Sequence, residues 1–142
     1  MAELKVNTLT GTSTAGSIAV TGEGNSTTTN LQQGLAKAWN VYSNSSGVAS
    51  TDSLNVSGMT DHGTGDNTTS YTNSFNSAKA YTFGGFSSHS SDVTTTTYTV
   101  QGKQDDSMAT GSTRYVNVYN TSSGCDVADY AILSVVSHGD LA

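Results

Sequence analysis

Short runs in which apolar and polar side chains alternate recur along this chain, and this period of two constrains the fold most. Residues 53–57, 95–100 and 114–119 alternate in this way, and successive side chains of a β-strand point to opposite faces of its sheet. Residues 130–136 are the most continuously apolar stretch and predict a central strand. About seven short strands at regular spacing are typical of an antiparallel sandwich or barrel. We therefore expect an all-β fold, an antiparallel β-sandwich.

Local patterns place some of these strands more closely. Residues 38–42 predict a strand that has Trp39 and Val41 on one face. Asp and Gly residues between 61 and 66 form a turn-rich connection ahead of residues 69–75. This arrangement predicts a β-hairpin.

The first 35 residues predict a separate N-terminal arm. Short strands are expected at 4–9 and 17–21, and residues 31–38 predict a short helix that a glycine limits. Because such segments cannot bury a core alone, we interpret 1–35 as an attachment and oligomerisation arm and 36–142 as the β-sandwich domain. The candidate attachment residues are the apolar side chains of the arm's two strands: Leu4, Val6, Leu9, Ile18 and Val20.

The apolar side chains available for a core are few. Leu, Ile, Val and Phe total 24 of 142 residues, whereas Ser and Thr make up about a third of the chain. Ordering a residue costs about 1–2 kcal/mol of backbone entropy, and burial contributes about 25 cal/mol per Å² of apolar surface. A charged fraction of 11% is low for a disordered chain. We therefore expect an obligate oligomer in which identical copies complete the burial.

The charges and the apolar runs exclude several partners. The five Lys and Arg residues are scattered in a chain of net charge −6, so no basic patch for nucleic acid is expected. No apolar stretch approaches the roughly 20 residues that cross a membrane, and the N-terminus lacks the pattern of a signal peptide. Assembly in the cytoplasm is expected. Cys125, the single cysteine, predicts a small buried side chain rather than a disulfide.

Metal-binding and catalytic patterns are weak. Each histidine has an acid nearby, as His62 has Asp61 and Asp66, but no two histidines are two residues apart. The glycines of this segment favour a solvated turn, and we assign no metal. Asp105 and Asp106 are adjacent and would point to opposite faces of a strand, unlike the carboxylate pair of a glycosidase. Without a nucleophile-elbow pattern, we predict no catalytic residue, no cofactor and no enzymatic activity.

Tyr115 and Tyr119 are the candidate binding residues of the β-domain. They share one face of the expected strand at 114–119, and Val116 and Val118 share the other. If the valines face the core, both tyrosines are exposed. Exposed rings suit either the apolar faces of a glycan or a neighbouring subunit, because Tyr is enriched at interfaces. Both uses stay open.

Three stretches of the chain resemble a known family. Residues 30–39 read NLQQGLAKAW, residues 52–66 read DSLNVSGMTDHGTGD, and residues 4–9 read LKVNTL. In this order and spacing they resemble tail-fibre-type structural proteins of marine and cyanobacterial tailed phages, over roughly the first 75 residues. The resemblance implies a virion structural role and a homotrimer, and it implies no catalytic residue.

These expectations predict a tail-fibre or adhesin-type subunit of a phage virion, assembled in the host cytoplasm. Its expected partners are identical copies, tail or baseplate proteins and a host cell-surface polysaccharide. A capsid decoration or head-fibre protein is the alternative, because it also needs an anchoring arm and a polar domain.

Overall fold

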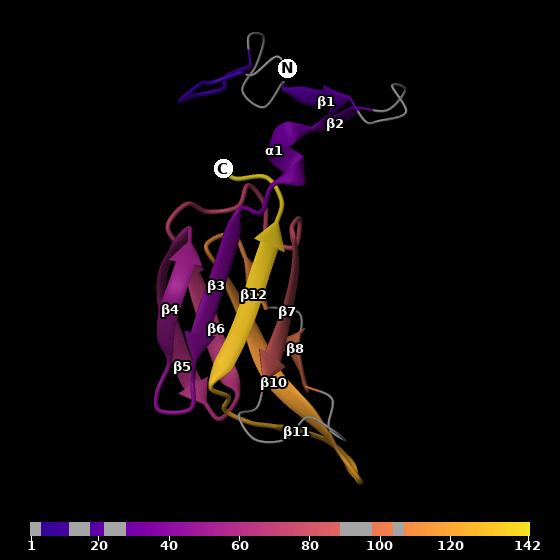
Figure 1. Ribbon diagram of the computed structural model, residues 1–142. Coiled ribbons are helices and arrows are strands. Elements are labelled where there is room, and N and C mark those ends of the chain that lie inside the picture. The colour runs from indigo at the N-terminus through magenta and orange to yellow at the C-terminus, as the bar shows by residue number, and fades with distance from the viewer. Residues whose placement is uncertain (1–3, 12–17, 22–27, 89–97, 104–106) are drawn as a thin grey trace. The chain divides into compact units, whose positions relative to one another are not determined.

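The chain is all-β, as predicted. The computed structural model describes residues 4–11, 18–21, 28–88, 98–103 and 107–142 (Figure 1). Its internal contacts divide the chain into two compact units, Met1–Leu35 and Ala36–Ala142. Apart from one four-residue helix, the regular structure of the described residues consists of β-strands, and all pairs between named strands are antiparallel.

The first unit contains a two-stranded sheet and this short helix. β1 (Ala19–Thr21) pairs with β2 (Thr28–Asn30), and α1 (Leu31–Gly34) follows β2 directly. The backbone N–H of Leu31 donates to the carbonyl of Ile18 at 2.8 Å. This hydrogen bond fixes the start of the helix beside β1. The helix ends at the predicted glycine, a residue about 1 kcal/mol less favourable than alanine inside a helix.

The strand predicted at residues 4–9 is wrong. Residues 4–11 contain no strand or helix, whereas the strand predicted at 17–21 is confirmed over Ala19–Thr21. A strand needs a neighbour that pairs with its backbone N–H and C=O groups. None of the described strands pairs with residues 4–9, so the alternating pattern alone does not make them a strand.

A four-stranded sheet forms one layer of the second unit. In spatial order its strands are β4 (Ala49–Leu54), β3 (Ala38–Ser43), β12 (Ile132–His138) and β7 (Thr82–Ser88). β12 lies between β3 and β7, which confirms the central strand predicted from residues 130–136. Leu133 and Val135 of β12 point inward and are buried.

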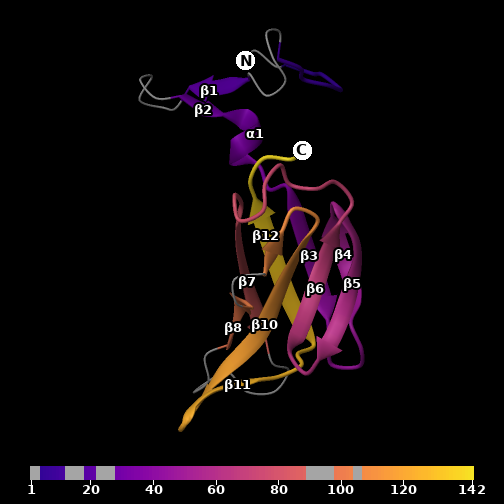
Figure 2. The same ribbon diagram turned by 180° about the vertical axis from the view of Figure 1, so that it is seen from behind.

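A six-stranded sheet forms the other layer (Figure 2). Its strands are β5 (Val56–Gly63), β6 (Asp66–Tyr71), β8 (Tyr98–Gly102), β9 (Met108–Ala109), β10 (Ser112–Thr121) and β11 (Gly124–Val127). β10 pairs with β6 and β11 along one edge and with β8 and β9 along the other. β5 and β6 form the predicted hairpin, and Gly63 and Gly65 supply its turn with φ values of +119° and +68° that suit glycine.

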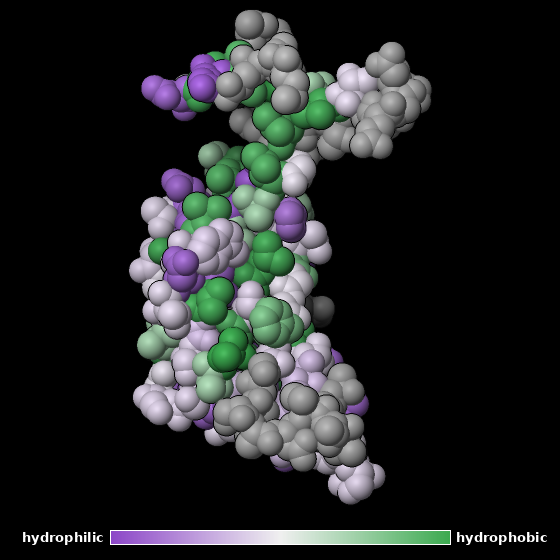
Figure 3. Space-filling view, in the orientation of Figure 1, coloured by the Kyte–Doolittle hydropathy of each residue, from purple (hydrophilic) through white to green (hydrophobic). Residues whose placement is uncertain are grey.

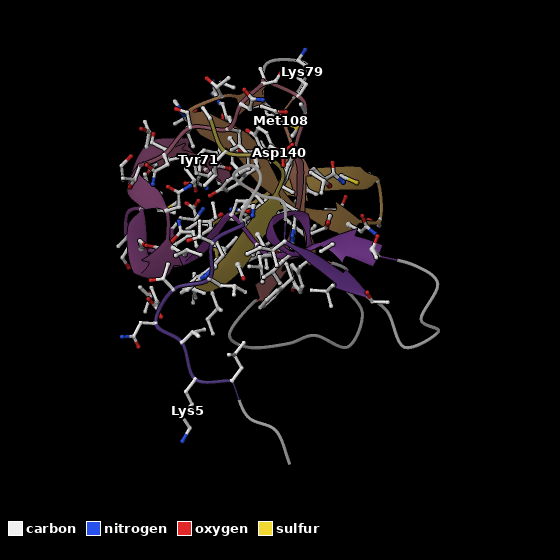
Figure 4. All side chains as sticks on the ribbon, turned by 90° about the horizontal axis from the view of Figure 1, so that it is seen from above. Lys5, Tyr71, Lys79, Met108 and Asp140 are labelled. Atoms are coloured by element: carbon white, nitrogen blue, oxygen red, sulfur yellow. The ribbon has the colours of Figure 1, made fainter. Side chains whose placement is uncertain are left out.

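The two sheets face each other across a shared core, in a β-sandwich-like arrangement (Figures 1 and 2). The main buried cluster takes Tyr42 and Leu133 from the four-stranded sheet and Val100 and Tyr115 from the other. A second cluster gathers the aromatic rings of Tyr71, Phe75 and Tyr81 with Ala38. Met108 packs against this second cluster, and Figure 4 labels it with Tyr71.

Hydroxyl and amide groups share this core with the aromatic rings. The Thr113 hydroxyl lies 2.6 Å from the hydroxyl of Tyr71 and 2.7 Å from that of Tyr81. The Thr69 hydroxyl lies 2.6 Å from that of Tyr115. Buried hydroxyls are stable only when they have such partners. A chain poor in aliphatic residues thus fills much of its interior with aromatic rings, and the hydroxyls of Tyr71, Tyr81 and Tyr115 bond to threonines.

Two further sequence predictions are wrong. The single strand predicted at 53–57 is broken at Asn55, whose φ of 58° is left-handed and lets the chain pass from β4 in one sheet to β5 in the other. The Asn55 side chain stabilises this passage, because its amide oxygen accepts the backbone N–H of Asn73 at 2.7 Å. Cys125 is exposed on β11 rather than buried.

Candidate functional site

The outer face of the four-stranded sheet carries a continuous set of apolar side chains. Trp39 of β3 lies directly opposite Leu54 of β4 and, on its other side, opposite Val136 of β12. Directly paired residues of an antiparallel sheet point to the same face. These three side chains therefore form a row across three strands, and it runs on to the glycine at position 84 of β7.

A second row extends the apolar surface along the strands. Val41 of β3 pairs with Ser134 of β12, which in turn pairs with Phe86 of β7. Ile132, two residues before Ser134, points the same way. Phe86 and Ile132 are 56% and 52% exposed, and Val41 is half-buried.

We call this surface the apolar sheet face, and it consists of Trp39, Val41, Leu54, Phe86, Ile132 and Val136. In Figure 3 apolar residues gather over β3 and β12, on the side of the four-stranded sheet that faces the viewer. The solvent face of an antiparallel sheet is ordinarily polar. A large contiguous exposed apolar patch marks an interaction site more often than chance exposure does.

The other sheet has a polar exterior over part of its width. Over β5, β6 and the first half of β10, the outward side chains are Thr60, Thr68, Ser70, Ser112 and Arg114. Farther along β10, the positions that alternate with the inward residues hold Val116 and Val118, and Val118 pairs with Val127 of β11.

The polar exterior includes a charged cluster. The Nε and Nη2 atoms of Arg114 donate to the two carboxylate oxygens of Asp66 at 2.9 and 2.8 Å, and the Lys103 ammonium also contacts this carboxylate. The hydrogen bonds from Arg114, helped by Lys103, hold the pKa of Asp66 well below its usual range. The cluster ties β6 to β10 and to the end of β8, and we interpret its role as structural.

Tyr115 does not have the exposure that a binding residue needs. The inward row of β10 is Thr113, Tyr115 and Asn117, and Tyr115 is only 1% exposed. Burial raises the pKa of its phenol to about 12. The expectation that this ring meets a glycan or a neighbouring subunit is therefore wrong. The premise that both valines of β10 are buried and both tyrosines exposed fails, because Tyr115 is buried between Thr113 and Asn117, although Val118 is buried as well.

Tyr119 keeps part of its exposure. It is half-buried, packs against the main core cluster, and places its hydroxyl 3.5 Å from a carboxylate oxygen of Asp126. A contact between Tyr119 and a glycan or a subunit stays a prediction.

The candidate attachment residues of the first unit are mostly exposed. Leu4 is 78% exposed, Val6 and Leu9 are each more than half exposed, Val20 is half exposed, and Ile18 is half-buried. Their role in attachment is a prediction, but their exposure leaves apolar surface for a partner to cover.

The histidines and acids do not gather into a site within the described residues. No group of three or more His, Cys, Asp and Glu side chains in that part of the chain is arranged to hold a metal ion. His62 is exposed, and its Nε2 lies 3.0 Å from the hydroxyl of Thr68. His89, Asp105 and Asp106 lie outside the described residues.

The apolar sheet face is the feature that the sequence predictions missed. The pairing of Trp39 with Val41 on one face was predicted, and it is correct, but that face is the outer one. Among the described residues no helix is long and apolar enough to cross a membrane. No protein-family model, curated protein or solved structure matches the chain.

Proposed function

We propose that the chain is a structural subunit of a phage virion, of the tail-fibre or adhesin type, that works by binding rather than by catalysis. The observation that carries this proposal is apolar surface exposed on both units: the attachment residues of the first and the apolar sheet face of the second. Exposed apolar surface of this extent suits a protein that functions inside an assembly. The resemblance of residues 30–39 and 52–66 to tail-fibre-type proteins supports the same class.

In this proposal the first unit anchors the subunit. Leu4, Val6 and Leu9, with Ile18 and Val20, pack against a tail or baseplate protein or against the same segment of other copies. The second unit is an antiparallel β-sandwich of a homotrimer that projects outward, and a host cell-surface polysaccharide contacts its polar exterior. Several copies strengthen a weak contact through avidity.

The position of the protein on the particle tests this function. Gold-labelled antibodies against the chain, viewed by electron microscopy on intact virions, are expected to mark the tail fibres or the baseplate. Labelling spread over the capsid shell would replace the proposal with the alternative, a capsid decoration or head-fibre protein. Virions without any label would refute both.

A pair of variants tests the anchor. Leu9→Asp places a charge among the candidate attachment residues and is expected to prevent incorporation of the chain into particles. Asn7→Asp adds the same charge two residues away at an exposed polar position and is expected to be incorporated normally. Equal incorporation of both variants would show that the exposed leucine does not anchor the subunit.

Catalysis is tested separately. Purified protein is incubated with envelope polysaccharide from the host, and the length of the polysaccharide is measured by size-exclusion chromatography. We expect unchanged chains. Shortened chains would identify a depolymerase and overturn the proposed non-enzymatic role.

A further inference from the structure

We propose that the apolar sheet face is the surface through which the second units of three copies pack around a common axis. This inference rests on the proposed function, which includes a homotrimer, and it assigns the trimer contact to one particular face. Each copy presents the outer face of β4, β3, β12 and β7 to the same face of its two neighbours.

The distribution of polarity across the face fits a buried contact. Trp39, Val41 and Val136 occupy its two central strands and already shield one another, since all three are half-buried. The edge strands carry Asp52 and Thr82 beside the apolar Leu54 and Phe86, and Ser134 is the polar side chain between Val41 and Phe86. A mainly apolar centre with some polar residues at the margin occurs in protein interfaces.

The charges favour a second copy of this chain as the occupant. Identical faces bring identical charges together, so a self-contact requires a centre without charge. The paired positions of β3 and β12 on this face hold only valine, tryptophan and serine. Asp52 lies on the outermost strand, where a threefold arrangement places it beside β7 of the next copy rather than beside a second Asp52.

The width of the sheet suits three copies. Four strands spaced by about 4.8 Å make a sheet about 19 Å wide. Three such sheets arranged as a triangular prism place each sheet about 5.5 Å from the axis, close to half of the about 10 Å that separates packed sheets. Side chains from three faces therefore meet at the axis without a large void.

The area of the apolar sheet face is smaller than a stable trimer contact requires. The face measures about 19 Å by about 20 Å, a footprint of about 400 Å², whereas a stable interface buries about 800 Å² per partner. A trimer shares this footprint between two contacts, so the face alone supplies about a quarter of the area that each contact needs. The exposed apolar residues of the first unit are the remaining contribution in the proposed homotrimer.

The exposure of the edge strand β4 is a second observation that bears on the proposal. All six of its residues are exposed, although an inner strand of the same sheet has every second side chain buried. Edge strands of free sheets are ordinarily protected by charged side chains, proline, β-bulges or a covering element. β4 has Asp52 and a β-bulge in its pairing with β3, but no lysine or proline in its sequence ASTDSL. In the threefold arrangement the neighbouring copy covers this strand at the corner of the prism.

Two matched double variants of the full chain test the assignment. Phe86→Asp with Ile132→Asp adds two charges to the apolar sheet face, at side chains exposed enough that folding does not depend on them. Thr60→Asp with Gln101→Asp adds the same charges at exposed positions on the outer face of the other sheet. Circular dichroism establishes that each variant is folded, and sedimentation equilibrium gives its mass over a range of concentrations.

The wild-type chain and the Thr60/Gln101 variant are expected to sediment at three times the 14.6 kDa of one chain. In the Phe86/Ile132 variant the concentration at which half of the trimer dissociates is expected to rise by more than about tenfold, and the dissociated species is expected to be a folded monomer. A Phe86/Ile132 variant that remains as trimeric as wild type overturns the assignment of the face, as does a wild-type dimer. A wild-type monomer overturns both the assignment and the homotrimer, whereas the location of the chain on the virion is decided by the labelling experiment alone.

Discussion

Replacing Thr113 by valine removes one hydroxyl from the centre of the buried polar network and nearly preserves the shape of the side chain. Thr113 is 2% exposed, and its Oγ1 lies 2.6 Å from the hydroxyl of Tyr71 and 2.7 Å from that of Tyr81. In the described residues no other side chain hydrogen-bonds to the hydroxyl groups of both Tyr71 and Tyr81. The substitution therefore tests whether the hydrogen bonds of the buried hydroxyl groups stabilise the fold.

The expected loss of stability depends on the hydrogen bonds that the Tyr71 and Tyr81 hydroxyls keep in the variant. The Tyr71 hydroxyl keeps a contact of 3.1 Å with the hydroxyl of Ser137, and the Tyr81 hydroxyl keeps two backbone carbonyls at 2.9 Å. Neither phenol is left without a partner, so the full penalty of an unsatisfied buried group does not apply. Two hydrogen bonds are lost at about 1 kcal/mol each, and we expect the free energy of unfolding to fall by about 1–3 kcal/mol.

Urea denaturation followed by circular dichroism measures this change, at one fixed protein concentration because the proposed association would make stability depend on concentration. Thr60→Val, at an exposed position, is the control and is expected to stay within about 0.5 kcal/mol of wild type. A double-mutant cycle with Tyr71→Phe is expected to give a coupling energy of about 0.5–3 kcal/mol. A Thr113→Val variant as stable as wild type, or a cycle without coupling, would refute the stabilising role of the network.

Two further predictions concern the second unit. Gly85→Ala is expected to destabilise the fold strongly, because the added Cβ would lie 2.5 Å from the carbonyl oxygen of Ser134. Gly84→Ala is expected to be tolerated, because its Cβ would meet no atom within 4 Å. Thermal unfolding compares the two variants, and equal midpoints would contradict the packing argument. Because its partners lower the pKa of Asp66, the stability that this group adds is present above its unfolded pKa of about 4 and is lost as the pH falls below it. The urea midpoint is therefore expected to fall on acidification, and Arg114→Met to flatten this dependence; an unchanged pH profile in that variant would argue against the ion pair.

The sequence predicted the fold class well because strands leave a strong local signal. The β5–β6 hairpin and the central position of β12 follow from turn residues and from one apolar stretch. The break at Asn55 carries no such signal, since a left-handed asparagine becomes recognisable only when the two sheets are in place. Residues 4–9 alternate as a strand does but have no neighbour to pair with among the described strands.

The assignment of faces failed for a different physical reason. Alternation shows which side chains share a face of a strand, but it does not show which face points inward. The prediction rests on the assumption that the more apolar set is buried. On β10 the buried residues are Thr113, Tyr115, Asn117 and Val118, whereas Val116 is only half-buried. The hydroxyls of Thr113 and Tyr115 have partners on the neighbouring strand β6, and the Asn117 side-chain oxygen accepts from Tyr42 of the facing sheet, whereas the Asn117 amide nitrogen has no hydrogen-bond partner. Local sequence does not contain that information, since the partners are distant along the chain.

The same inversion on β3 connects the interior of the second unit to its exterior. Asn40 and Tyr42 point inward, and the Asn40 side-chain oxygen accepts a hydrogen bond from the Ser50 hydroxyl at 2.5 Å, while Trp39 and Val41 point outward. A strand has two faces, so polar residues committed to the inner face leave the apolar ones outside. A chain with few aliphatic residues that places several of them on one outer face gains their burial only when another surface covers them. The hydroxyl-rich core and the apolar sheet face are therefore two consequences of one arrangement, and the second gives the proposed association its energetic basis.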